Sequence, residues 1–165
     1  MNYATIKPLD IANGPGVRTS LWVSGCTNQC KGCFNPETWN FKYGQEFTMN
    51  TMKEIVEHLD NPNVNGLSIL GGEPLHPRNI ETVTDICKTV KRLKPNKTIW
   101  LWTGYDFIED GLIDYPIMQY IDVLVDGKFE EGLKDLRLKY AGSSNQRIID
   151  VSKSLECGCA VKWGD

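Results

Sequence analysis

The chain has 165 residues, 41% of them hydrophobic, which predicts one domain with a buried core. A net charge of −3 gives no indication of nucleic acid or an anionic membrane as the main partner. The first twenty residues lack the apolar core of a signal peptide, and no apolar run is long enough to span a bilayer, so we expect a soluble cytoplasmic protein.

The first half of the chain predicts two strands and one helix. Residues 19–23 form a short apolar run typical of a buried strand, which ends at a cysteine-rich loop. Residues 51–54 match a capping box, so we expect a helix to begin there. Its apolar stripe consists of Met52, Ile55, Val56 and Leu59. Residues 67–70 predict the second strand, which Gly71 and Gly72 interrupt.

The second half continues the alternation. Ile80, Val83, Cys87 and Val90 recur at helical spacing, and Cys87 is therefore expected to be a small core residue. Three further strands are expected at residues 98–102, 121–125 and 147–151. Strands that alternate with helices imply right-handed βαβ crossovers and a mostly parallel sheet.

The length of the chain limits the architecture. A full eight-stranded barrel takes roughly 250 residues, so the α/β fold that we expect is a partial, laterally open (βα) barrel. Sites in such sheets form at the carboxyl ends of the strands. The cysteine loop, the segment beginning at Gly71 and residues 103–105 each follow an expected strand directly. They should therefore meet at one edge of the sheet.

Cys26, Cys30 and Cys33 have the spacing C-x3-C-x2-C, and no fourth cysteine follows nearby. A cubane iron–sulfur cluster has four irons, each normally held by one thiolate, so three cysteines leave one iron open to a small molecule. In a reducing cytosol the six cysteines are better explained as ligands, reactive thiols or core residues than as disulfides.

Two other chemistries fit the same cysteines. Three thiolates could hold zinc with His58 or His76 as the fourth ligand, although His58 falls within the first expected helix. A thioredoxin-like redox pair of Cys30 and Cys33 is the other alternative, but it leaves Cys26 without a role. Of these readings, the cluster accounts best for all three thiols.

The sequence resembles radical S-adenosylmethionine enzymes, in which C-x3-C-x2-C follows the first strand. Within that superfamily it is similar to the activating enzymes of anaerobic class III ribonucleotide reductases. The position before the third cysteine is often aromatic in the superfamily, whereas Gly32 stands there in this chain, as in that subgroup. The matching segments are residues 13–18 (NGPGVR), 23–26 (VSGC), 32–35 (GCFN), 71–77 (GGEPLHP), 102–105 (WTGY), 123–129 (VLVDGKF) and 142–146 (GSSNQ).

The resemblance implies a shortened radical S-adenosylmethionine core over residues 1–150 and a C-terminal tail over residues 151–165. It implies that Cys26, Cys30 and Cys33 bind a [4Fe-4S] cluster, and that S-adenosylmethionine chelates the open iron. Reductive cleavage would give a 5′-deoxyadenosyl radical, which abstracts hydrogen from a glycine of the reductase. The implied partners are the anaerobic reductase and reduced flavodoxin or ferredoxin as electron donor. No side chain is assigned as a general acid, base or nucleophile.

The same resemblance implies contacts to S-adenosylmethionine. Gly71 and Gly72 would let backbone approach the cofactor closely, and the Glu73 carboxylate suits its amino group. Thr103 follows the third expected strand and would meet the ribose or adenine, or only pack in a turn. The remaining expected cofactor-binding residues are the last metal ligand and its two neighbours: Gly32, Cys33 and Phe34. Phe34 could pack on the adenine or cap the core beneath the loop.

Several other polar residues have open roles. Arg18 could hold the cofactor carboxylate or the partner, or lie on the surface. Asp126 could bind a hydroxyl or an amide, or be solvated, and Tyr105 could meet the cofactor or pack in a turn. The cluster at residues 143–146 could bind a peptide backbone or cap itself. Cys157 and Cys159 could bind metal or form a disulfide.

Two rival functions remain open at this point. One is a different radical S-adenosylmethionine enzyme, such as another glycyl-radical activase. The other is a zinc-binding interaction module without catalysis. The short chain and the order of the matching segments favour the reductase activase over both.

Overall fold

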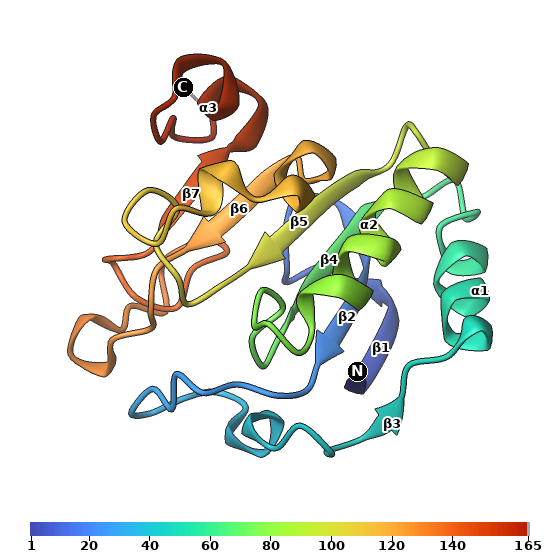
Figure 1. Cartoon of the computed structure of the whole chain (residues 1–165), viewed down its shortest axis with the longest axis horizontal. Coiled ribbons are helices and arrows are strands. Elements are labelled where there is room, and N and C mark those ends of the chain that lie inside the picture. Colours follow the sequence, from blue (N-terminus) through green and yellow to red (C-terminus); the bar gives the residue numbers. More distant parts are fainter. Residues whose placement is uncertain (165) are drawn as a thin grey trace.

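Seven strands form one mixed sheet in the computed structural model, which describes residues 1–164 (Figure 1). Their spatial order is β3-β1-β2-β4-β5-β6-β7. The strands are β1 (Asn2–Asp10), β2 (Val17–Val23), β3 (Gln45–Glu46), β4 (Val64–Gly71), β5 (Thr98–Trp102), β6 (Val123–Asp126) and β7 (Arg147–Asp150). The helices are α1 (Met49–His58), α2 (Ile80–Leu93) and α3 (Val151–Cys157), with 3-10 turns η1 (Pro36–Trp39), η2 (Leu112–Asp114), η3 (Pro116–Tyr120) and η4 (Glu131–Leu133).

The centre of the sheet is parallel and its two sides are antiparallel. Strands β2, β4, β5 and β6 run in the same direction, whereas β1 pairs antiparallel with β2 and β3, and β7 pairs antiparallel with β6. The sheet does not close, because β3 and β7 occupy its two ends. The α/β class, the parallel centre and the open sheet are as expected, and the partial barrel stays a prediction.

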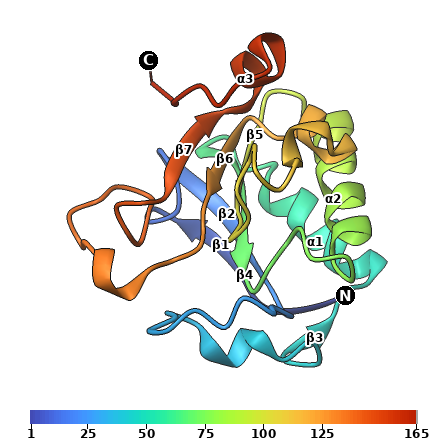
Figure 2. The same cartoon turned by 60° about the vertical axis from the view of Figure 1, so that its left-hand side comes forward.

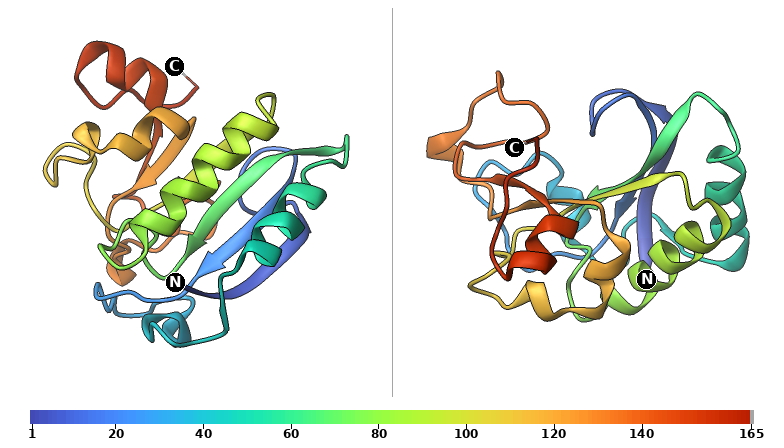
Figure 3. Two further views of the ribbon diagram at one scale, coloured as in Figure 1. Left: turned by 45° about the vertical axis from the view of Figure 1, so that its right-hand side comes forward. Right: turned by 90° about the horizontal axis from the view of Figure 1, so that it is seen from above.

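Helices α1 and α2 cover one face of the sheet (Figure 3). The expected apolar stripes point inward, since Ile55, Leu59 and Val83 are fully buried and pack with strand residues in one core. Cys87 is also fully buried there, as its helical register predicted. Val56 is only half-buried at the margin of the stripe.

Helix α1 begins earlier than the sequence predicted. The prediction of a capping box at residues 51–54 is wrong, because Thr48 is the N-cap and Thr51 is the third helical residue. The Thr51 hydroxyl accepts from the Thr48 amide at 3.1 Å, and the Thr48 hydroxyl accepts from the Thr51 amide at 3.4 Å. Two threonines three residues apart therefore make the reciprocal pair that the pattern assigned to Thr51 and Glu54.

Strand β1 was absent from the sequence prediction. It lies next to the short edge strand β3, pairs with it only at Asn2 and Tyr3, and buries only Tyr3 and Asp10, so it shows no regular apolar alternation. Lys7 and Pro8 lie in its outer half, where charge and proline discourage pairing with another chain. The connection from β5 to β6 also differs from a helical crossover, because it consists of the two short turns η2 and η3.

The C-terminal segment folds back on β7 at the top of Figure 1. The Asp150 side chain caps α3 by accepting from the Lys153 amide. The chain beyond α3 then pairs with β7: Val161 O accepts from the Asp150 amide at 2.9 Å, and the Trp163 amide donates to Ile148 O at 2.8 Å. This return covers the outer edge of β7. None of the helices described here has the length and apolar composition needed to cross a bilayer.

Candidate functional site

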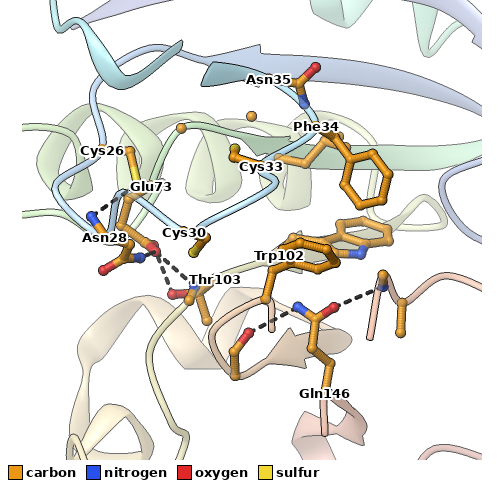
Figure 4. Close-up of a pocket in the computed structure, with 18 of the residues that line it drawn as sticks. Cys26, Asn28, Cys30, Cys33, Phe34, Asn35, Glu73, Trp102, Thr103 and Gln146 are labelled. Atoms are coloured by element: carbon orange, nitrogen blue, oxygen red, sulfur yellow. Dashed lines mark hydrogen bonds between the residues drawn. The ribbon is translucent and has the colours of Figure 1, made fainter. Parts of the chain in front are cut away.

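Three loops meet at the carboxyl ends of β2, β4 and β5, as the sequence predicted. They enclose a cavity of about 440 Å³. The cysteine loop follows β2, Gly72 and Glu73 follow β4, whose last residue is Gly71, and Thr103 follows β5. Figure 4 shows the cysteines near Glu73 and Thr103 at one side of the view, and Phe34 and Trp102 at the other. The sequence-predicted site residues that line this cavity are Cys26, Cys30, Cys33, Phe34, Gly71, Gly72, Glu73 and Thr103.

Cys26, Cys30 and Cys33 are free and partly buried. Burial raises the pKa of the Cys26 and Cys30 thiols. The Asn28 amide donates to Cys26 Sγ at 3.4 Å, which opposes that shift. At Cys30 the positive charge of Lys128 acts in the same direction, toward a lower pKa. The loop thus combines a sheltered position with groups that stabilise thiolates.

The donor set of the cavity fits an iron–sulfur cluster. Thiolates are the ligands that such clusters use, and all three thiols belong to one cavity wall. The three thiols are not close enough together to hold a single metal ion. Within residues 1–164, no three His, Cys, Asp or Glu side chains are placed to do so. A cubane spreads its ligands over separate irons, so three spaced thiols suit it.

The two glycines after β4 let backbone pack against backbone. A Cβ on Gly71 would lie 2.6 Å from Val23 O, and one on Gly72 would lie 2.6 Å from Gly25 O. The Gly72 and Glu73 amides instead donate to Val23 O and Gly25 O, each at 2.8 Å. Their observed role is to bring the turn against the start of the cysteine loop. Contact with a cofactor stays a prediction.

Glu73 is completely buried and joins all three loops. Its Oε1 accepts from the Thr103 hydroxyl at 2.7 Å and the Leu75 amide at 3.0 Å. Its Oε2 accepts from the Gly104 amide at 2.8 Å and Asn28 Nδ2 at 3.1 Å. Burial raises the pKa of Glu73, and these four donors oppose the rise. An amino group bound by this carboxylate would therefore replace one of four existing donors.

Gly32 and Phe34 flank the third cysteine differently. Gly32 has φ 71°, and a Cβ there would lie 2.7 Å from Glu131 Oε1, which accounts for glycine. Phe34 is 55% exposed, with its ring centroid 5.1 Å from that of Phe129. Lys134 Nζ lies 4.9 Å from the Phe34 centroid. Phe34 therefore stands at the cavity wall with part of its ring free, and it does not cap the core.

The expectations for Arg18 are wrong, because it neither reaches the cavity nor lies on the surface. It is completely buried. Its guanidinium donates to Ser68 Oγ at 2.7 Å, Thr98 Oγ1 at 3.0 Å and the carbonyls of Leu67 and Thr98. Arg18 is a structural cross-link between β2, β4 and β5. The Arg18 guanidinium carbon Cζ also lies over the Trp100 ring, 5.7 Å from the ring centroid.

Asp126 and the 143–146 cluster mainly hold the chain itself together. Asp126 is completely buried, accepts from the Phe107 amide at 2.8 Å and forms an ion pair with Arg147. Gln146 accepts from the Gly142 and Ser143 amides and donates to Gly127 O, while Asn145 donates to Lys128 O. Of the readings given above, the self-capping loop is the one observed. Gln146 also lines the cavity.

Neither candidate for a fourth zinc ligand belongs to the cavity. His58 lies in α1, and its Nε2 is 3.5 Å from Glu54 Oε1. His76 accepts from the Arg78 amide through Nδ1, and its ring centroid lies 4.7 Å from that of Phe41.

Tyr105 packs against the core from a partly buried position. At the other end of the molecule, Cys157 and Cys159 form a disulfide.

Sequence reasoning missed two asparagines of the site. Asn28 lies between two of the cysteines and reaches Glu73. Asn79, at the start of α2, is buried and donates through Nδ2 to Ser24 O at 3.1 Å, Gly25 O at 3.3 Å and Glu73 O at 2.9 Å. Its position after Pro77 gave no indication of a contact 55 residues away. Asn28 was recognisable only as a polar residue within the cysteine motif.

Comparison with known proteins agrees with this chemistry. A family model described as a 4Fe-4S single cluster domain matches residues 12–149. A protein of Enterobacteria phage T4 is 46% identical over 148 residues, covering 90% of this chain and 93% of the phage protein. Proteins of Escherichia coli K12 (46% over 153 residues) and Vibrio cholerae (44% over 150 residues) each match over 90% of this chain and 97% of their own length. All three are named anaerobic ribonucleoside-triphosphate reductase-activating protein.

Proposed function

Because the chain belongs to the family of anaerobic ribonucleoside-triphosphate reductase-activating proteins, we propose that it is a radical S-adenosylmethionine glycyl-radical activase. Its substrate would be a glycine of the partner reductase. The observation that carries the proposal is the set of three free thiols, Cys26, Cys30 and Cys33, on the wall of one cavity at the carboxyl end of the parallel strands.

The three thiolates would hold three irons of a [4Fe-4S] cluster and leave the fourth for S-adenosylmethionine. When bound and reduced, the cluster would supply the one electron that splits the S–C5′ bond of S-adenosylmethionine into methionine and a 5′-deoxyadenosyl radical, which would take hydrogen from the glycine and end as 5′-deoxyadenosine. The protein provides position and electrostatics. The Asn28 amide and Lys128 stabilise the thiolate forms of Cys26 and Cys30 that metal binding needs.

The cavity walls would orient S-adenosylmethionine. Backbone groups of Gly71 and Gly72 border the cavity, and Phe34 offers a partly exposed aromatic side chain against which adenine would pack. Glu73 and Thr103 would contact the cofactor from the side of the cavity opposite Phe34 (Figure 4). The hydrogen bond between them fixes both side chains. Cys33 would complete the wall through the cysteine loop, and Gly32 precedes it without lining the cavity.

The proposal requires two protein partners. The reductase must insert a backbone glycine into the cavity, which favours an extended segment entering from the open side of the sheet. An electron donor such as reduced flavodoxin or ferredoxin must reduce the cluster before each activation. A cytoplasmic location, where such donors and the reductase meet, is part of the same proposal.

Anaerobic incubation tests the proposal directly. The protein is reconstituted with iron and sulfide and mixed with its reductase, S-adenosylmethionine and dithionite. Electron paramagnetic resonance should show a glycyl-radical doublet on the reductase, accompanied by 5′-deoxyadenosine. A protein with full iron content that released no 5′-deoxyadenosine would contradict the radical mechanism. Brown, air-sensitive absorption separates the cluster from zinc, which is colourless.

A further inference from the structure

Residues 128–142, which we call the flap, leave the sheet after β6 and return before β7 (Figure 2). The flap exposes three leucines to solvent. Leu133 is 43%, Leu136 83% and Leu138 37% exposed. Leu136 and Leu138 also border the outer part of the cavity that contains the cysteines. Apolar side chains grouped beside a cavity mouth are typical of a surface that another molecule covers.

The flap holds its leucines outward because its base is fixed. The Asp135 amide donates to Gly142 O at 3.3 Å and the Ser144 amide to Leu133 O at 2.9 Å. Trp102 Nε1 donates to Tyr140 O at 2.7 Å, which attaches the end of the flap to β5. Tyr140 has φ 64°, an uncommon conformation for a residue with a side chain. These bonds keep the flap from collapsing onto its own leucines.

The charged side chains of the flap that form no ion pair are mostly lysines. Glu131 pairs with Lys31 at 3.2 Å and Asp135 with Arg137 at 2.8 Å. Within residues 1–164, Lys128, Lys134 and Lys139 have no ion-pair partner, against Glu130 alone among the flap acids. The chain as a whole carries −3, so this surface differs in sign from the molecule. A partner with acidic side chains would be attracted to it.

We propose that the flap is the docking surface for the reductase, and that it receives an extended segment with apolar side chains flanked by acidic ones. This inference rests on the proposed function, since a glycine must reach the same cavity. The continuity of Leu136 and Leu138 with the cavity favours a segment that ends there. A second copy of this chain fits less well, because a two-fold contact would set the unpaired lysines of two flaps against each other.

The test compares two leucine-to-glutamate variants in the holoprotein. Leu133→Glu places a charge on the flap at a residue that is 43% exposed and does not line the cavity, whereas Leu93→Glu places the same charge at the end of α2, where Leu93 is 49% exposed. Anaerobic calorimetry measures binding to the reductase. We expect Leu133→Glu to weaken binding at least tenfold and Leu93→Glu to leave it within twofold. Both variants should release 5′-deoxyadenosine with dithionite alone at the wild-type rate.

The charge component has a separate readout. Lys139→Glu should weaken binding several-fold at low salt, and the difference from wild type should shrink as salt is raised, because exposed charges are screened. If wild type and both leucine variants bind the reductase equally, the docking surface is refuted while the activase function stands. Conversion of a wild-type dimer to a monomer by Leu133→Glu, with reductase binding intact, would assign the flap to self-association and overturn the inference.

The proposed function fails in a different way. In that case the wild-type holoprotein would leave the reductase without a glycyl radical, or release no 5′-deoxyadenosine, whatever the binding data show. Loss of reductase binding in Leu133→Glu but not in Leu93→Glu, with 5′-deoxyadenosine release intact in both, supports the flap as the docking surface.

Discussion

At the scale of single residues, Cys30 is the middle one of the three cysteines in the loop. Burial and the neighbouring Cys33 raise the pKa of its thiol, and the charge of Lys128 lowers it. We expect Cys30→Ala to abolish cluster assembly and 5′-deoxyadenosine release, because two thiolates leave two irons without protein ligands. The thermal midpoint should change little, since Cys30 is partly exposed in a loop. Iron and sulfide analysis with circular dichroism measures both quantities.

Cys87→Ala is the matched control for Cys30→Ala. Cys87 is buried in the core, where burial raises the pKa of its thiol to about 12. Its removal should lower the free energy of unfolding by about 1 kcal/mol and leave iron content unchanged. Equal iron content in the Cys30 and Cys87 variants would contradict the ligand assignment.

Glu73 serves as an anchor for the loops as well as a candidate cofactor contact. Glu73→Ala removes the acceptor for four donors, one of them on Asn28 within the cysteine loop. We expect weaker S-adenosylmethionine binding, by about tenfold or more, together with a partial loss of iron. Titration of the reconstituted variant measures both.

Glu73→Gln sharpens this test. It keeps the shape of the side chain but turns an NH₂ group toward N–H and O–H donors, so it should resemble Glu73→Ala. Wild-type affinity in Glu73→Gln would show that the carboxylate neither positions the loops nor contacts the cofactor.

At the scale of elements, Asn79 attaches the start of α2 to the two loops that follow β2 and β4. Its Nδ2 donates to three carbonyls in a buried position, so Asn79→Ala leaves them short of a partner. We expect a loss of about 1–3 kcal/mol in the free energy of unfolding and faster loss of iron to a chelator. Asn50→Ala, at an exposed position in α1, should change neither quantity and provides the control.

At the scale of the whole molecule, the C-terminal segment and the cysteine loop lie at opposite ends of the sheet (Figure 1). Trp163 packs edge-on against Trp100, with 4.9 Å between ring centroids. Trp163→Ala should lower the free energy of unfolding by about 1–2 kcal/mol, because it removes an aromatic pair that covers the sheet. Denaturant unfolding measures this loss.

Iron content and S-adenosylmethionine affinity should stay at wild-type values in Trp163→Ala, since Trp163 does not line the cavity. Trp163→Phe keeps an aromatic edge and should recover most of the stability. A loss of iron in Trp163→Ala would show that the two ends of the sheet are coupled.

The sequence by itself determined the central strands, the two helices on the sheet and the meeting of three loops at one edge. These follow from local patterns: apolar runs, helical spacing and the rule that parallel strands present their carboxyl ends together. It also singled out the three cysteines as candidate metal ligands, since all three fall within eight residues of the chain. It could not reveal β1, because only Tyr3 and Asp10 of that strand are buried and the strand shows no regular apolar alternation.

Only the tertiary structure decided what the polar residues of the site do. Arg18 was a candidate contact for the cofactor or the partner, yet it is buried and bonded to β4 and β5. Asp126 was expected to bind a hydroxyl or an amide or to be solvated, and the structure shows it buried and bound to the Phe107 amide. Glu73 and Asn79 join loops that are remote in sequence, and the flap presents leucines that a pattern would place in a core. Such roles depend on which donors and surfaces long-range folding brings together, and no local pattern records that.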